Sequence, residues 1–175
     1  MKNFVSLYRK YKYKIRSMQI NIEEREARAR ELFLEGYNCA QAVVMAYCDV
    51  MELAPEQAAR IAASFGGGMG RMREVCGTVS GMALVASALA PSSDPKNMAE
   101  RQQNYALVQS FAGSFRQENG DIVCRRLLGL EPMVEKSETT MPSERTAEYY
   151  KKRPCVEYVG CAARIIAEYI ASREI

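Results

Sequence analysis

The feature that most constrains the fold is a series of helix-start signals along almost the whole chain. Each signal is a capping side chain, or a proline suited to a first turn, followed by apolar residues at helical spacing. No segment alternates polar and apolar residues between hairpin turns, as a half-buried strand would. We therefore expect a single-domain, all-α bundle of seven to eight helices. The signals predict helices over residues 21–35, 38–52, 55–65, 76–90, 95–118, 121–129, 143–150 and 154–172.

The first 17 residues differ from the rest of the chain in charge. They carry six Lys and Arg side chains and no acid, although the whole chain has a net charge of only +3. We expect residues 1–17 to form a basic N-terminal extension and residues 18–175 to form the all-helical domain. A basic, tyrosine-containing segment is compatible with binding to nucleic acid or a membrane surface. No nucleic-acid-binding module accompanies it, so we expect no nucleic-acid partner.

The hydrophobic segments of the chain indicate where in the cell the protein is expected to lie. The longest strongly apolar run covers residues 79–90, well short of the roughly 20 residues that a transmembrane helix needs. The N-terminus also lacks the apolar stretch of a signal peptide. We expect a cytoplasmic protein without a transmembrane segment, where grouped cysteines more often serve metal or redox chemistry than structural disulfides. The small residues in this apolar run also leave a homodimer open.

Four of the six cysteines stand at predicted helix starts, and the chain contains no histidine: the four are Cys39, Cys76, Cys124 and Cys155. A cysteine in the first turn faces the positive end of the helix dipole, which favours the thiolate. Without histidine, any redox or metal chemistry must use mainly sulfur. No two cysteines are spaced Cys-x-x-Cys, so only the fold can bring them together. We predict that these four side chains converge on one site.

The other two cysteines are predicted to lie apart from this group. Cys48 and Cys161 fall inside helices. On an ideal helix, Cys161 points roughly 170° away from the apolar stripe of the last helix, whereas Cys155 lies within roughly 50° of it. We interpret Cys48 and Cys161 as small packing residues without a functional role.

A glycine-rich run, Gly66–Gly70, precedes Cys76. It has neither the lysine of a Walker A loop nor the glycine spacing of a dinucleotide site. We expect the glycines to permit close backbone approach or positive φ beside Cys76, and Arg71 and Arg73 to favour its thiolate. The candidate cofactor-binding residues next to the sulfurs are Gly68, Gly70, Arg71 and Gly77.

Together these segments resemble the C_GCAxxG_C_C family, which is named after its four cysteines. The matching segments are Gly36–Ala42, Gly66–Gly70 with Cys76–Gly81, Cys124–Gly129, and Cys155 with Tyr158 and Val159. The resemblance covers about residues 22–172, and Thr78 replaces the alanine of the family's Cys-Gly-Ala-x-x-Gly. It implies a small bacterial redox-active protein, of a kind often encoded near oxidoreductase or transport genes, in which an iron–sulfur centre is suspected. It does not imply a defined reaction.

Three functions are compatible with the sequence. In the first, two of Cys39, Cys76, Cys124 and Cys155 form a reversible disulfide, and proton transfer falls to Tyr37, Glu74, Asp121 or water. In the second, the four thiolates hold an iron–sulfur cluster. In the third, they hold a structural zinc ion or simply pack within a non-catalytic helical binding module. The expected partner is a redox protein or a small thiol or disulfide, and oxidoreductase activity is left open.

Overall fold

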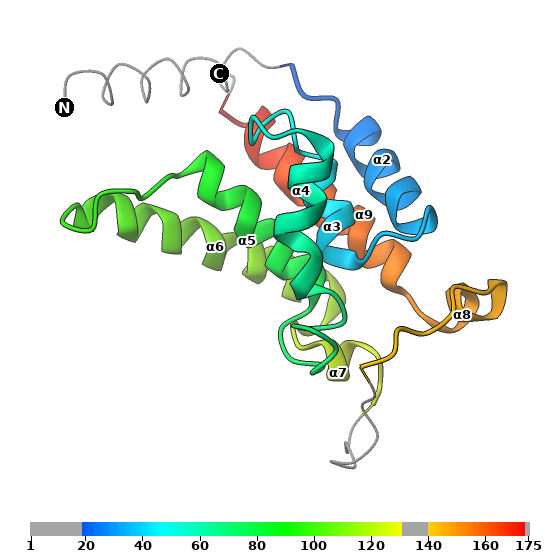
Figure 1. Ribbon diagram of the computed structural model, residues 1–175. Coiled ribbons are helices and arrows are strands. Elements are labelled where there is room, and N and C mark those ends of the chain that lie inside the picture. Colours follow the sequence, from blue (N-terminus) through cyan, green and yellow to red (C-terminus); the bar gives the residue numbers. More distant parts are fainter. Residues whose placement is uncertain (1–18, 131–139, 174–175) are drawn as a thin grey trace.

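The computed structural model describes residues 19–130 and 140–173, and the predicted basic extension at residues 1–17 lies outside them. The described residues form eight α-helices and one short 3-10 helix, with no β-sheet (Figure 1), which confirms the all-α prediction. The 3-10 helix is η1 (Ala63–Phe65). The α-helices are α2 (Ile22–Leu34), α3 (Cys39–Met45), α4 (Pro55–Ala62), α5 (Gly77–Leu89), α6 (Met98–Asn119), α7 (Cys124–Leu127), α8 (Ala147–Lys152) and α9 (Cys155–Ala171).

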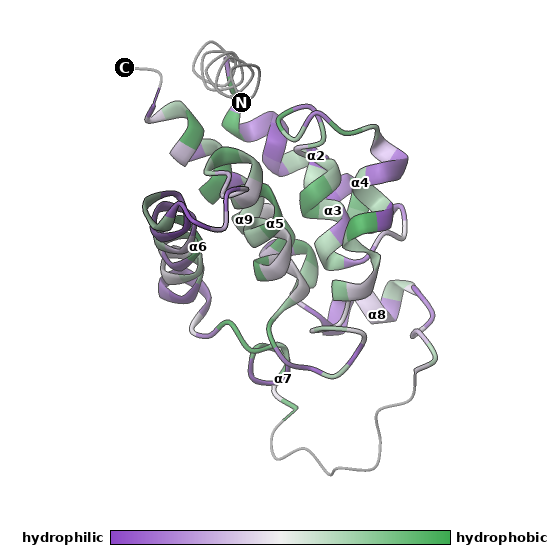
Figure 2. Ribbon diagram, turned by 60° about the vertical axis from the view of Figure 1, so that its left-hand side comes forward, coloured by the Kyte–Doolittle hydropathy of each residue, from purple (hydrophilic) through white to green (hydrophobic). Residues whose placement is uncertain are grey.

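The last helix, α9, forms the centre of the bundle. It packs against α2, α3, α5 and α6, and it is buried on nearly every side. Figure 2 shows apolar α5 and α9 in the interior and many hydrophilic residues on α6 at the outside. The hydroxyl of the fully buried Tyr47 donates a 2.5 Å hydrogen bond to the backbone carbonyl of Ala163 and so fixes the segment after α3 to this central helix.

Several helix boundaries differ from the predicted ones. The helix predicted from residue 121 begins at Cys124, because Asp121 instead accepts from the amides of Ile122 and Val123, and the helix predicted from residue 143 begins at Ala147, because Thr146 caps the Tyr149 amide. The α-helix predicted over residues 38–52 ends at Met45, and the chain continues in tighter turns in which the amides of Tyr47 and Cys48 donate to carbonyls three residues back. The helix predicted from residue 95 begins at Met98, because the Asn97 side chain caps the Glu100 amide. Asp94 instead closes a separate turn by accepting from the Lys96 amide.

The short helices α7 and α8 lie at one end of the bundle (Figures 1 and 2). The glycine-rich loop, the first residues of α3 and α9 and the residue before α5 reach the same end, because all of them line one pocket there. None of the helices in the described ranges is both long and apolar enough to cross a membrane.

Candidate functional site

Each of the four predicted cysteines stands at a helix start. Cys39, Cys124 and Cys155 are the first residues of α3, α7 and α9, and Cys76 is the residue immediately before α5. All six cysteines of the chain are unbridged in this structure. The local sequence signals were therefore sufficient to place these four side chains at helix N-termini.

Asn38 fixes the position of Cys39. Its side-chain oxygen accepts hydrogen bonds of 3.0 Å from the amides of Ala40 and Gln41, and the Gln41 side chain accepts in return from the Asn38 amide at 2.9 Å. The side-chain NH₂ group of Asn38 also donates to the Ala63 carbonyl at 2.9 Å. This reciprocal cap starts α3 and also joins it to η1, at the entrance to the glycine-rich loop.

A short backbone pairing places Cys76 near Cys124. Val75 and Val123 form an isolated antiparallel bridge. Beside it, the Cys76 amide donates to the Ile122 carbonyl at 2.8 Å and the Cys124 amide donates to the Glu74 carbonyl at 2.7 Å. In this register Cys76 lies opposite Ile122, two residues before Cys124, so the two cysteines share one face as diagonal neighbours.

The glycines allow backbone to approach the cysteines closely. A Cβ atom on Gly68 would lie 2.7 Å from Cys124 Cβ, and one on Gly77 would lie 2.6 Å from the Phe65 carbonyl oxygen and 3.4 Å from Cys39 Cβ. Gly68 also has a φ of +76°, which an L side chain rarely adopts. Close approach and positive φ, the two expected roles of these glycines, are therefore both present.

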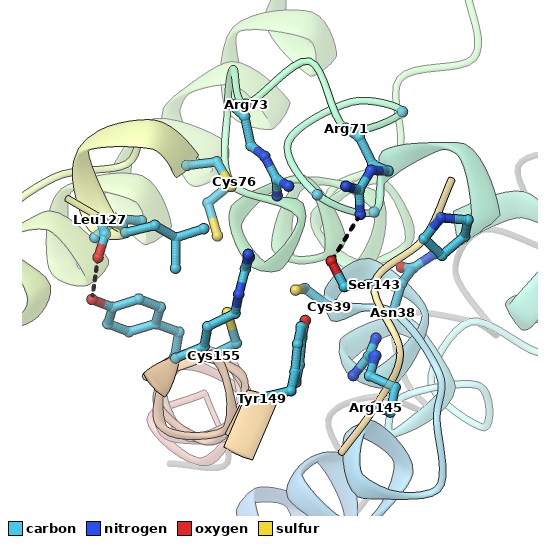
Figure 3. A pocket seen from close by; sticks show the side chains of 18 of the residues that line it. Asn38, Cys39, Arg71, Arg73, Cys76, Leu127, Ser143, Arg145, Tyr149 and Cys155 are labelled. Carbon is cyan, nitrogen blue, oxygen red and sulfur yellow. Dashed lines mark hydrogen bonds between the residues drawn. The ribbon is translucent and has the colours of Figure 1, made fainter. Parts of the chain in front are cut away.

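The four cysteines line one pocket of about 270 Å³. Figure 3 shows the side chains of Cys39, Cys76 and Cys155 around a common space that Arg71 and Arg73 also enter. Of the candidate cofactor-binding residues, Gly70 and Arg71 line this pocket. Gly68 and Gly77 are not among its lining residues and lie behind it, packed against Cys124 and against Phe65 and Cys39.

A family model described as "Putative redox-active protein (C_GCAxxG_C_C)" matches residues 37–169, which is more than half of the chain and includes all four of these cysteines. The chain belongs to the C_GCAxxG_C_C family. No curated protein and no solved structure matches it.

The pocket formed by the C_GCAxxG_C_C segments is strongly cationic. Four arginines line it, and none of its described lining residues is Asp or Glu; the arginines are Arg71, Arg73, Arg145 and Arg153. Sequence reasoning identified Arg71 and Arg73 but missed Arg145 and Arg153. Arg153 lies two residues before Cys155, so its proximity along the chain could have identified it as a pocket residue. Arg145 lies farther from any cysteine in the sequence, so no local signal identified it.

Burial reverses the expected ionisation of three of the family cysteines. It is the main cause that raises the pKa of the Cys76 thiol to about 12 and also raises that of Cys124, although Arg73 opposes it at Cys124. The Cys39 pKa is raised well above its usual range, first by a hydrogen bond to Cys155 and then by burial. The helix-start position alone therefore does not make these thiols acidic, because desolvation of the charged form outweighs the helix dipole.

Cys155 is the exception among the four. A hydrogen bond from Cys39 lowers its pKa below the usual value and outweighs the opposing effect of burial, and Arg153 acts in the same direction. The two thiols are thus unequal: Cys155 has the lowered pKa and is the better thiolate, whereas the raised pKa of Cys39 keeps that thiol protonated.

The proton-transfer residues predicted from the sequence do not line the pocket. Glu74 forms a 2.8 Å ion pair with Arg125, and Asp121 accepts from the amides of Ile122 and Val123. Tyr37 likewise lies outside the described lining. Two other tyrosines, Tyr149 and Tyr158, line it instead, and burial raises the pKa of both, so they are neutral hydrogen-bond donors at neutral pH.

Cys48 and Cys161 do not line the pocket. Cys48 is half-buried and packs beside Ala58 and Ala62 of α4. Cys161 is buried, in agreement with its interpretation as a packing residue, because α6 covers that side of α9. Asn119 donates to its sulfur at 3.2 Å and its thiol contacts Glu118 at 3.5 Å. Both residues remain apart from the four family cysteines.

The arrangement does not match a metal centre. Within the described residues, no three Cys, Asp or Glu side chains are grouped in a way that could hold one metal ion. Four sulfurs around a pocket are therefore not the closed tetrahedral set that zinc requires.

Proposed function

We propose that the protein is a thiol–disulfide redox protein in which Cys155 and Cys39 alternate between two thiols and one disulfide. The observation that carries this proposal is that these two side chains, at the starts of α3 and α9, line one pocket and shift each other's pKa, downward at Cys155 and upward at Cys39. An attacking thiolate beside a protonated second thiol is the arrangement that disulfide exchange needs. The proposal includes a cytoplasmic location, where the thiols return to the reduced state.

The proposed reaction follows from the difference between the pKa values of Cys155 and Cys39. The Cys155 thiolate attacks one sulfur of a substrate disulfide, forming a mixed disulfide and releasing one substrate thiolate. Cys39 then loses its proton and attacks Cys155 Sγ, which breaks the mixed disulfide and releases the second thiolate. The substrate gains two electrons and leaves as two thiols; one proton comes from Cys39 and the other from water, because Cys155 begins as a thiolate, and the protein keeps a Cys39–Cys155 disulfide. Tyr149, which lines the pocket, is the neutral group proposed to solvate the departing thiolate, whereas the Tyr158 hydroxyl already donates to the Leu127 carbonyl at 3.1 Å.

Cys76 and Cys124 are the less suitable pair for the first disulfide. Their backbone register makes them diagonal neighbours, and diagonal positions lie roughly 7–8 Å apart. A disulfide usually joins residues whose Cα atoms lie about 4.4–6.8 Å apart, so this pair is the less favourably spaced one. We propose that these two thiols remain reduced when the Cys39–Cys155 bond forms.

Thiol counting and peptide mapping test this assignment. The reduced protein is treated with diamide and the disulfide is located by mass spectrometry. Wild type and the control variant Cys48→Ser should each lose two thiols and show a Cys39–Cys155 link. Cys155→Ser should form no link within the pocket, and Cys39→Ser should stop at a mixed disulfide on Cys155 when a small disulfide is added.

Two results would contradict the proposal. One is a first disulfide that joins any other two cysteines in wild type. The other is stoichiometric iron with acid-labile sulfide, or zinc, in protein purified without oxygen, which would instead support the Cys₄ metal alternative.

A further inference from the structure

We propose that the substrate is a small disulfide that carries negatively charged groups such as carboxylates, and that the pocket arginines select it. This inference rests on the proposed function and names the substrate class of the same site. It chooses between the two partners that the sequence left open, a redox protein and a small thiol or disulfide.

The charges around the pocket carry the argument. Arg71, Arg73, Arg145 and Arg153 line it and no described lining residue is acidic. Among the described residues, neither Arg145 nor Arg153 forms an ion pair with a carboxylate. Arg145 is held by the carbonyls of Phe33 and Tyr37. Both guanidinium groups lie 5.1 Å from the centre of the Tyr149 ring. Positioned arginines of this kind bind carboxylates through paired hydrogen bonds.

The burial of the sulfurs limits the size of the substrate. Cys76, Cys124 and Cys155 expose only 5%, 6% and 8% of their surface, and the pocket volume is about 270 Å³. A disulfide on the surface of a folded protein would have to bring its own backbone into this space. A small molecule can enter it directly, since pockets of a few hundred Å³ are typical of small-ligand sites.

The same charges favour the chemical step. Attack by the Cys155 thiolate on a disulfide releases a second thiolate, so negative charge moves from Cys155 to the departing sulfur. Fixed guanidinium groups around both positions stabilise that charge without reorganising. A substrate that carries carboxylates is also drawn into the pocket before reaction, because a cleft lined by one sign of charge raises the local concentration of opposite charge.

Three disulfides of similar size and different charge test the inference. The fully reduced protein is mixed at low ionic strength with 3,3′-dithiodipropionate (dianion), 2-hydroxyethyl disulfide (neutral) or cystamine (dication). The rate of thiol loss is then measured. We expect the dianion to react at least about tenfold faster than the dication, with the neutral disulfide between them, and the difference to shrink as salt is added.

A pair of neighbouring variants separates substrate selection from thiol activation. Arg153→Gln removes a pocket charge, whereas Lys152→Gln removes an exposed charge that pairs with Glu148 outside the pocket. The readout is the ratio of the dianion rate to the neutral rate, because any change in Cys155 reactivity affects both rates equally. We expect the ratio to fall about three- to tenfold in Arg153→Gln and to stay within about twofold of wild type in Lys152→Gln.

The outcomes distinguish this inference from the function on which it rests. Equal rates with all three disulfides, each yielding the Cys39–Cys155 bond, would overturn the charge selection and leave the thiol–disulfide function standing. Failure of all three to oxidise that pair would overturn the function itself. A preference for the dianion that persists unchanged in Arg153→Gln would also overturn the assignment to the pocket arginines.

Discussion

At the scale of single residues, two opposing effects act on the pKa values of the cysteine thiols: the helix dipole lowers them and burial raises them. The sequence places four cysteines where the dipole favours a thiolate, yet burial raises the pKa of Cys76 and Cys124. Only Cys155, which receives a hydrogen bond from Cys39, has a lowered pKa. Thr78 is the residue that departs from the family pattern. It is buried beside Cys76 and lowers the pKa of that thiol against the larger effect of burial.

The first prediction concerns the pH dependence of Cys155. Its rate of alkylation by iodoacetamide, measured at that residue by mass spectrometry, should rise with pH to a midpoint below the ordinary thiol value of about 8.5. Replacing Cys39 with Ala removes the hydrogen bond and should move the midpoint upward, whereas Cys39→Ser keeps a donor and should move it less. An identical midpoint in wild type and Cys39→Ala would contradict the role given to Cys39.

Local signals in the sequence predicted the positions of these cysteines but not the direction of their pKa shifts. The positions of the four cysteines at helix starts were predicted correctly, although only Cys39 follows a capping side chain, Asn38, and α5, α7 and α9 have none. The sign of the pKa shifts depends on how much protein covers each sulfur, which is a property of the folded chain. The helical wheel of the last helix placed Cys161 away from the apolar stripe, but it could not show that α6 covers that side and buries the thiol.

At the scale of secondary-structure elements, small residues control how closely helices approach. Gly81 on α5 faces α3, where an added Cβ would lie 2.9 Å from Val43 Cβ and 3.2 Å from the Ala40 carbonyl oxygen. Ala86 of the same helix is also fully buried. The small residues that left a homodimer open are thus used in packing within the chain. This contact matters for the site because α3 and α5 begin at Cys39 and directly after Cys76.

The second prediction compares two helical glycines. Gly81→Ala should lower the free energy of unfolding by about 1–3 kcal/mol, because the new methyl group collides with Val43 and backbone. Gly113→Ala in α6 meets nothing within 4 Å and should raise stability by about 0.5–1 kcal/mol. Denaturant unfolding of both variants measures the difference. A Gly81→Ala protein as stable as Gly113→Ala would contradict the close α3–α5 contact.

Some element boundaries were predictable from the sequence and others were not: α2 and α4 begin where predicted, whereas α6, α7 and α8 begin later than predicted. Caps act locally, so α2 begins after Asn21 as predicted. The end of α3 at Met45 depends instead on the position of Tyr47, whose hydroxyl bonds to Ala163 far along the chain. The rim of the pocket contributed by Ser143, Arg145 and Tyr149 was not predicted, because no local pattern links those residues to cysteines that precede them by many residues.

At the scale of the whole molecule, buried thiols connect stability to pH. The unfolded Cys76 thiol ionises near pH 8.5, but burial holds its pKa at about 12 in the folded protein. Between these values the unfolded state releases the proton and the folded state keeps it, so stability falls as pH rises. Cys155 acts in the opposite direction: its lowered pKa stabilises the folded state above the unfolded pKa, and this contribution is lost as pH falls.

The third prediction is a loss of stability in alkaline solution. For the fully reduced protein, the free energy of unfolding should fall between about pH 9 and 11, because the raised pKa values of Cys39, Cys76 and Cys124 act together. Cys76→Ala should reduce the slope by up to about 1.4 kcal/mol per pH unit. Urea unfolding at several pH values measures both slopes, and equal slopes in the two proteins would be inconsistent with a buried, protonated Cys76.

The positions of the proposed pair have a mechanical consequence. Cys39 opens α3 near the start of the bundle and Cys155 opens its central final helix, so a bond between them would enclose most of the chain in a covalent ring. A ring of roughly 100 residues restricts the unfolded chain by about 4–5 kcal/mol in the chain-entropy model. Each turnover would then switch the protein between a reduced form whose unfolded chain is linear and an oxidised form whose unfolded chain is closed into a loop. The resistance of the protein to denaturation would therefore depend on its oxidation state.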